Sequence, residues 1–94
     1  MDATKIEKIL NHYDPEAQTV KAIEELAELQ AELSRLLIKQ GDIEAMKSEL
    51  ADVVIMTSQL MYIFNVDPEE LDEIATFKLD RQLQRIEEEL AKKQ

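Results

Sequence analysis

Two pairs of acidic residues share a spacing that suits a metal site built on helices. Glu25 and Glu28 form one pair, and Glu49 and Asp52 form the other, each three residues apart. In a helix this spacing places two carboxylates side by side on one face. Two such helices packed antiparallel would gather four carboxylates, whose repulsion favours a hard divalent cation among them. The pattern therefore predicts a carboxylate site for Mg²⁺, with Mn²⁺ as the alternative ion.

The surroundings of these pairs distinguish them from other acids at the same spacing. On a helical wheel at about 100° per residue, Glu49 lies within an apolar face beside Val53 and Met56, and Asp52 lies at the edge of that face. Glu25 borders an apolar stripe of its own helix. A buried carboxylate is costly without a partner, so these positions favour a bound cation.

A plainer interpretation of the acids stays open. Glu25 and Glu28 would then be solvated surface acids, and lysine or arginine would neutralise Glu49 and Asp52. Three more acid pairs at this spacing stand at one expected helix start, where capping and the helix dipole account for them. These pairs are Asp67/Glu70, Glu69/Asp72 and Glu70/Glu73.

The elements that must position the acids are predicted to be helices. One glycine, two prolines and many Glu, Leu, Ala and Lys residues are typical of an all-α chain. Asp14 and Asp67 each precede a proline, a combination that starts helices. Gly41, the only glycine, is expected to end a helix in the left-handed conformation, and Asp42 to cap the next. The expected helices cover residues 4–12, 15–39, 43–64 and 68–91.

The short turn at Gly41 makes the second and third helices antiparallel neighbours. We therefore expect a single domain over residues 1–94, an antiparallel bundle of about four helices. The helix over 43–64 is apolar on nearly all sides, which one small protomer can hardly cover. A homodimer or homotetramer is therefore predicted.

Charge and composition restrict the partners. The formal net charge is −10, from 21 acidic and 11 basic residues, which disfavours binding to nucleic acids or anionic membranes. The chain has no cysteine, so thiolate zinc sites and cysteine nucleophiles are excluded. The first ten residues do not resemble a secretory signal, and the longest apolar stretch is too short to span a bilayer. A cytoplasmic protein is expected.

The acids also carry a family resemblance. The run Glu24-Glu25-x-x-Glu28, followed by Glu49-x-x-Asp52, resembles the EExxE and ExxD signature of the MazG-like all-α nucleoside triphosphate pyrophosphohydrolases. The resemblance extends from about residue 15 to residue 85. Order, spacing, helical setting and chain size all agree with it.

The resemblance implies an activity and a role for each acid. Members of this family hydrolyse nucleoside triphosphates between the α and β phosphates, giving a monophosphate and pyrophosphate, and they use Mg²⁺. Glu25, Glu28, Glu49 and Asp52 would be the metal ligands. Glu24 would be the base that activates the attacking water, or an acid that supports the ligands. A role in nucleotide-pool housekeeping would follow.

Basic residues for the phosphates are expected further along the chain. Lys78, Arg81 and Arg85 lie three and four residues apart on one face of the last expected helix. Lys78 and Arg81 would bind the triphosphate. The family's pattern pairs such a lysine with a nearby asparagine, which this chain lacks. The alternative for this face is ordinary surface charge that balances the acids of the same helix.

Three other functions share features with this sequence. A carboxylate di-iron bundle requires Glu-x-x-His pairs, which are absent. Phosphoribosyl-ATP pyrophosphohydrolase has a similar helical layout, but Ile55 and Met56 stand where its histidine is expected. A noncatalytic helical interaction module, with acids that only maintain solubility, is the alternative from a different class.

Overall fold

The computed structural model describes residues 1–93 and contains four α-helices. They are α1 (Ala3–His12), α2 (Pro15–Leu37), α3 (Ile43–Ile63) and α4 (Pro68–Lys92). The predicted all-α class with four helices is confirmed, and every predicted helix end lies within two residues of the observed one. None of these helices is long and apolar enough to cross a membrane.

An aspartate precedes each helix and caps it. The side chains of Asp2, Asp14, Asp42 and Asp67 accept hydrogen bonds of 2.8 to 3.0 Å from backbone N–H groups of the first turn. These bonds satisfy N–H groups that have no partner within the helix, and the negative charge offsets the positive end of the helix dipole. Local sequence thus determines where each helix begins.

The turn between α2 and α3 differs from the prediction. Lys39 adopts the left-handed conformation with φ of 60°, while Gly41 does not. The N–H groups of Lys39 and Gln40 donate to the carbonyls of Leu36 and Arg35, at 3.1 and 2.9 Å. This is the Schellman pattern of helix termination, so the prediction of a left-handed Gly41 is wrong. Glycine is required for space instead, because a Cβ at this position would lie 2.8 Å from the Leu36 nitrogen.

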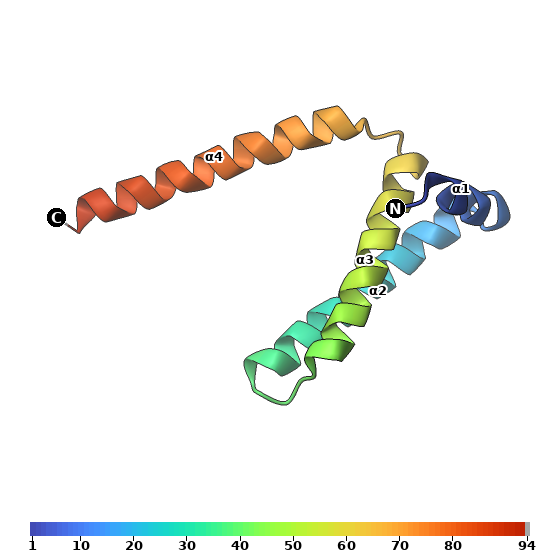
Figure 1. The fold of residues 1–94 in the computed structure, drawn as a ribbon, viewed down its shortest axis with the longest axis horizontal. Helices are drawn as coiled ribbons and strands as arrows, with labels where there is room; N and C mark the ends of the chain where they lie inside the picture. Colours follow the sequence, from blue (N-terminus) through green and yellow to red (C-terminus); the bar gives the residue numbers. More distant parts are fainter. Residues whose placement is uncertain (94) are drawn as a thin grey trace.

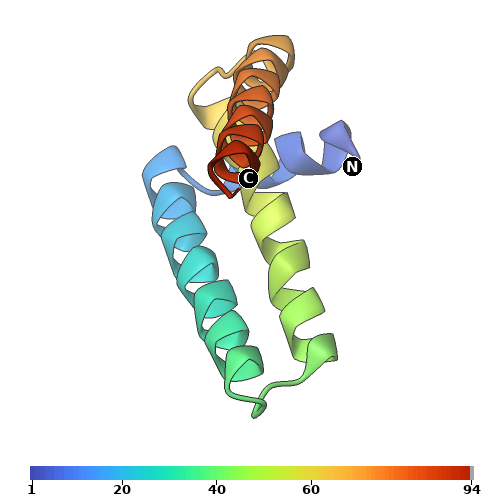
Figure 2. The ribbon, with the colours of Figure 1, turned by 90° about the vertical axis from the view of Figure 1, so that its left-hand side faces the viewer.

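Helices α2 and α3 form an antiparallel hairpin (Figure 2). The residues along their contact repeat at alternating intervals of three and four, which is the seven-residue repeat of a coiled coil. We call these positions the seam, and every one of them is buried or partly buried. The seam consists of Gln18, Ala22, Glu25, Leu29, Glu32 and Leu36 on α2, and of Ala45, Glu49, Asp52, Met56, Gln59 and Ile63 on α3.

The buried part of the seam contains both polar and apolar side chains. Within residues 1–93, three of the six buried side chains are polar or charged, namely Gln18, Glu25 and Gln59. Gln18 Nε2 donates to Gln59 Oε1 at 2.6 Å across the hairpin. Polar pairs of this kind fix the register between packed helices. Glu25 lies seven residues after Gln18 on α2, and Asp52 lies seven residues before Gln59 on α3. Because the helices are antiparallel, the register that pairs the two glutamines also places Glu25 opposite Asp52.

Helices α1 and α4 lie outside the hairpin. Helix α1 packs on α3 and buries Ile6. Helix α4 extends away from the hairpin (Figure 1), after a turn in which Asn65 takes the left-handed conformation, and all its residues are exposed. The radius of gyration is 17.4 Å, whereas a compact domain of this length has about 12 Å. The four helices therefore do not close into a bundle within one chain.

Candidate metal site

Three of the acids singled out in the sequence meet at the seam. Glu25 comes from α2, and Glu49 and Asp52 come from successive turns of α3. One carboxylate oxygen from each lies within 4.8 Å of the other two. Glu25 is only 6% exposed, and Glu49 and Asp52 are partly buried. We call these three residues the acid cluster.

Two oxygens of the acid cluster lack the partners that buried polar atoms normally have. Oε2 of Glu25 and Oε2 of Glu49 are shielded from solvent and accept no hydrogen bond. Most buried polar atoms in folded proteins are hydrogen-bonded, because desolvation without a partner is costly. An ionised carboxylate can only accept, so in that form a hydrogen-bond donor or a cation would satisfy these oxygens.

One basic residue reaches the acid cluster. The ammonium group of Lys21 lies 3.2 Å from Oε1 of Glu25 and 3.9 Å from Oε2 of Glu24. Within residues 1–93, no other lysine or arginine forms an ion pair with a member of the cluster. A single positive charge thus faces three carboxylates. Sequence reasoning missed Lys21, although its position four residues before Glu25 is a usual spacing for a helical ion pair.

The excess of negative charge and the burial of these side chains shift the pKa values of Glu49 and Asp52. The pKa of Glu49 is raised, mainly by burial and then by hydrogen bonding to Glu28 and the charge of that residue. Burial also raises the pKa of Asp52, and the charge of Glu25 adds to the effect while Lys21 opposes it. Glu25 in turn raises the pKa of Lys21. Glu49 and Asp52 therefore hold protons more tightly than free side chains do.

The other predicted residues on α2 lie beside the acid cluster. Glu28 is exposed and lies close enough to Glu49 to raise its pKa, but it does not belong to the group of three. Glu24 is exposed and points to Lys21. Glu24 and Glu28 therefore lie at the exposed edge of the acid cluster, on either side of Glu25 in sequence.

The structure does not bring the predicted phosphate-binding residues to the acids within one chain. Lys78 and Arg81 lie on α4, which extends away from the hairpin (Figure 1). Both are exposed, and the Arg81 guanidinium lies 5.8 Å from the centre of the Phe77 ring. Within one chain, Lys78 and Arg81 therefore lie apart from the acid cluster.

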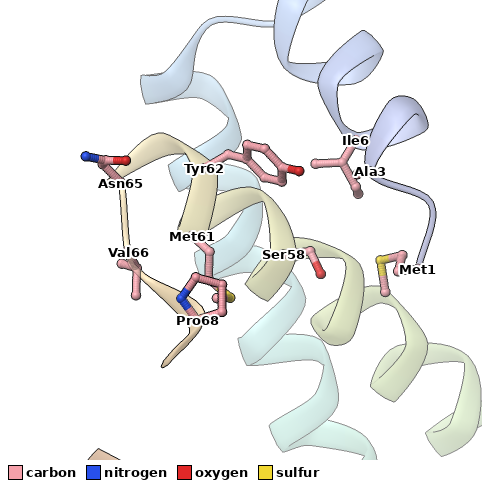
Figure 3. A pocket seen from close by; sticks show the side chains of 9 residues that line it. All are labelled: Met1, Ala3, Ile6, Ser58, Met61, Tyr62, Asn65, Val66 and Pro68. Carbon is pink, nitrogen blue, oxygen red and sulfur yellow. The ribbon is translucent and has the colours of Figure 1, made fainter. Parts of the chain in front are cut away.

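A separate apolar pocket of about 380 Å³ lies between α1, the end of α3 and the start of α4 (Figure 3). No member of the acid cluster lines it. Its lining consists of Met1, Ala3, Ile6, Ser58, Met61, Tyr62, Asn65, Val66 and Pro68. On α3, Ser58 is half a helical turn out of phase with Glu49, so the pocket and the cluster occupy different sides of this helix.

The comparisons with known proteins identify no relative. No protein-family model, curated protein or solved structure matches the chain.

Proposed function

We propose that the α2–α3 hairpin binds a divalent cation through Glu25, Glu49 and Asp52. The observation that carries this proposal is the carboxylate of Glu25, which is more than nine-tenths buried and has one oxygen without a partner inside the acid cluster. A donor set made only of carboxylate oxygens suits hard cations such as Mg²⁺ or Mn²⁺. Glu28, which lies beside Glu49, is the fourth ligand in this proposal.

For the activity, we propose Mg²⁺-dependent hydrolysis of nucleoside triphosphates between the α and β phosphates, as in MazG-like proteins. An acidic chain repels a triphosphate, so a cation at the cluster would supply the attraction that the protein itself lacks. A bound Mg²⁺ would also stabilise charge on the phosphoryl oxygens and lower the pKa of a bound water. The proposal includes a housekeeping role on the nucleotide pool of the cytoplasm.

Among the residues of the chain, Glu24 is the proposed general base. It neighbours Glu25 in sequence, and its side chain is 58% exposed, so it is accessible to a water molecule and to a substrate. Its ion pair with Lys21 is long, at 3.9 Å, and leaves the carboxylate free to accept a proton.

The proposed enzyme is a homo-oligomer. Both hairpin helices leave large apolar side chains exposed away from the seam: Ile23, Leu26, Leu33 and Leu37 on α2, and Ile43, Leu50 and Val54 on α3. At about 100° per residue, the α2 side chains lie on a flank of their helix beside the seam, and the α3 side chains lie on the face turned away from the seam. A second copy of the chain can cover this exposed apolar surface. An assembly would also let Lys78 and Arg81 of one copy reach a substrate on its partner.

Pyrophosphate release from a panel of triphosphates tests the proposed activity. The panel contains canonical and modified nucleoside triphosphates and phosphoribosyl-ATP, each with millimolar Mg²⁺. We expect release by the wild-type chain and background release by Glu49→Gln. Glu44→Gln is the matched control, because Glu44 is an exposed acid of α3 bound only to Lys47. Equal activity of Glu49→Gln would refute the site, and hydrolysis of no triphosphate would favour the noncatalytic module.

A further inference from the structure

Lys21 holds an unusual place among the basic residues of the hairpin. Its ammonium contacts Oε1 of Glu25, while Oε2 of the same carboxylate is buried in the acid cluster without a partner. Half of the Lys21 side chain, 53%, is exposed, whereas only 8% of the Glu25 side chain is. The lysine therefore approaches the cluster from the solvent side and can leave it without disturbing the seam.

The negative charges around Lys21 explain why its ammonium group lies against the carboxylate of Glu25. Glu24 and Glu25 both lie within ion-pair distance of its ammonium group. Glu28, one helical turn after Glu24, also contributes to its electrostatic environment. The remaining ion pairs described for the hairpin, Arg35–Glu32 and Lys47–Glu44, do not include the cluster. Lys21 is thus the local counter-ion of the α2 carboxylates of Glu24, Glu25 and Glu28.

We propose that Lys21 is a displaceable counter-ion: a divalent cation takes over the charge of Glu25, and the freed ammonium then binds the anionic ligand of that cation. This inference rests on the proposed metal site and adds a positioning residue to it. A dication satisfies the acid cluster better than one ammonium does, because it has twice the charge and can contact all three carboxylates. The released ammonium lies on the solvent side, where a phosphate group would arrive, and ammonium groups bind phosphates by charge-assisted hydrogen bonds.

This exchange predicts opposite effects of one substitution on two ligands. Lys21→Met removes the competitor of the metal, so Mn²⁺ alone should bind about two- to fivefold more tightly, in line with the modest strength of exposed ion pairs. The same variant loses a charged donor, so inorganic pyrophosphate in saturating Mg²⁺ should bind about tenfold more weakly or worse. A merely structural lysine would weaken both interactions or neither.

Isothermal titration calorimetry on the full chain measures both affinities. Lys21→Arg keeps the positive charge and should resemble the wild type with both ligands. Lys47→Met, which removes an exposed i,i+3 ion pair of α3 away from the cluster, should leave both affinities unchanged. Circular dichroism confirms that each variant is helical.

The outcomes separate this inference from the proposed function. Tighter Mn²⁺ binding together with weaker pyrophosphate binding in Lys21→Met supports the exchange. If the wild type binds Mn²⁺ but Lys21→Met binds it equally well or more weakly, the displaceable role is wrong while the metal site stands. The same holds if the pyrophosphate affinity of the variant is unchanged. A wild-type chain that binds no Mn²⁺ overturns the metal site itself.

Discussion

Replacing Asp52 by asparagine should stabilise the metal-free protein and abolish its response to metal. Glu25 and Asp52 present oxygens within 4.8 Å of each other, and two unit charges at that distance repel by about 0.9 kcal/mol in a water-like medium and about 3.5 kcal/mol at an effective dielectric constant near 20. Asp52 is partly exposed, which moves the value toward the lower end. We expect Asp52→Asn to raise the metal-free stability by about 1 to 2 kcal/mol.

Thermal melts with and without metal give the readout. For a chain of 94 residues, the gain corresponds to a midpoint higher by about 5 to 10 °C in chelator. Metal at a hundred times its dissociation constant should stabilise the wild type by about 2.7 kcal/mol, or by at least about 10 °C. Asp52→Asn should lose most of that shift, so the order of the two midpoints reverses when metal is added.

The matched control is Asp80→Asn, which removes the same charge from the exposed helix α4. Its midpoints should follow those of the wild type in both conditions. A lower metal-free midpoint for Asp52→Asn, together with an intact metal shift, would show that the carboxylate is structural and would refute the reasoning.

Three further predictions concern pH, the seam and the turn. The pKa values of Glu49 and Asp52 are raised above their ordinary 4.5 and 3.8, so folding favours the protonated forms of both side chains. In chelator, the melting midpoint should therefore fall as the pH rises from about 4 through the raised pKa values. Saturating Mg²⁺ should reduce this dependence of the midpoint on pH. Gln59→Leu leaves buried Gln18 without its partner and should lower the unfolding free energy in urea by about 1 to 3 kcal/mol, while leucine at both positions should recover most of the loss. Gly41→Ala places a Cβ 2.8 Å from the Leu36 nitrogen and should cost about 1 to 3 kcal/mol in the same assay, a reasoning that an unchanged midpoint would contradict.

The helices were predictable because their signals are local. Asp14, Asp42 and Asp67 cap helices where the sequence analysis placed the starts. The end of α2 was harder to predict, because Lys39 takes the left-handed conformation that glycine usually takes. Nearby Gly41 resembled a left-handed cap in sequence, but its role depends on how closely the turn brings its backbone to Leu36, which the residue types alone do not specify.

The acid cluster was predictable in composition and less so in detail. Helical periodicity placed Glu49 and Asp52 on an apolar face, and the turn implied an antiparallel partner. The wheel put Glu25 only at the margin of its stripe, yet it is one of the most buried side chains, because the seven-residue repeat places it on the seam. Gln18 and Gln59 were not noticed, although both occupy seam positions. The sequence pattern predicted the helix α4 but not its position, in which all its residues are exposed.

The seam also determines where the chain can change in length. One residue inserted into α3 between Asp52 and Gln59 would turn Glu49 and Asp52 by about 100° relative to the glutamine pair. The acids would then leave the contact with α2, although every original residue would still be present. Seven inserted residues would restore the phase but carry Glu49 and Asp52 about 10 Å past Glu25, so the acid cluster would re-form only if α2 also gained seven residues between Gln18 and Glu25. Additions within α4 leave this phase untouched, so the two halves of the protein differ sharply in the insertions they can accept.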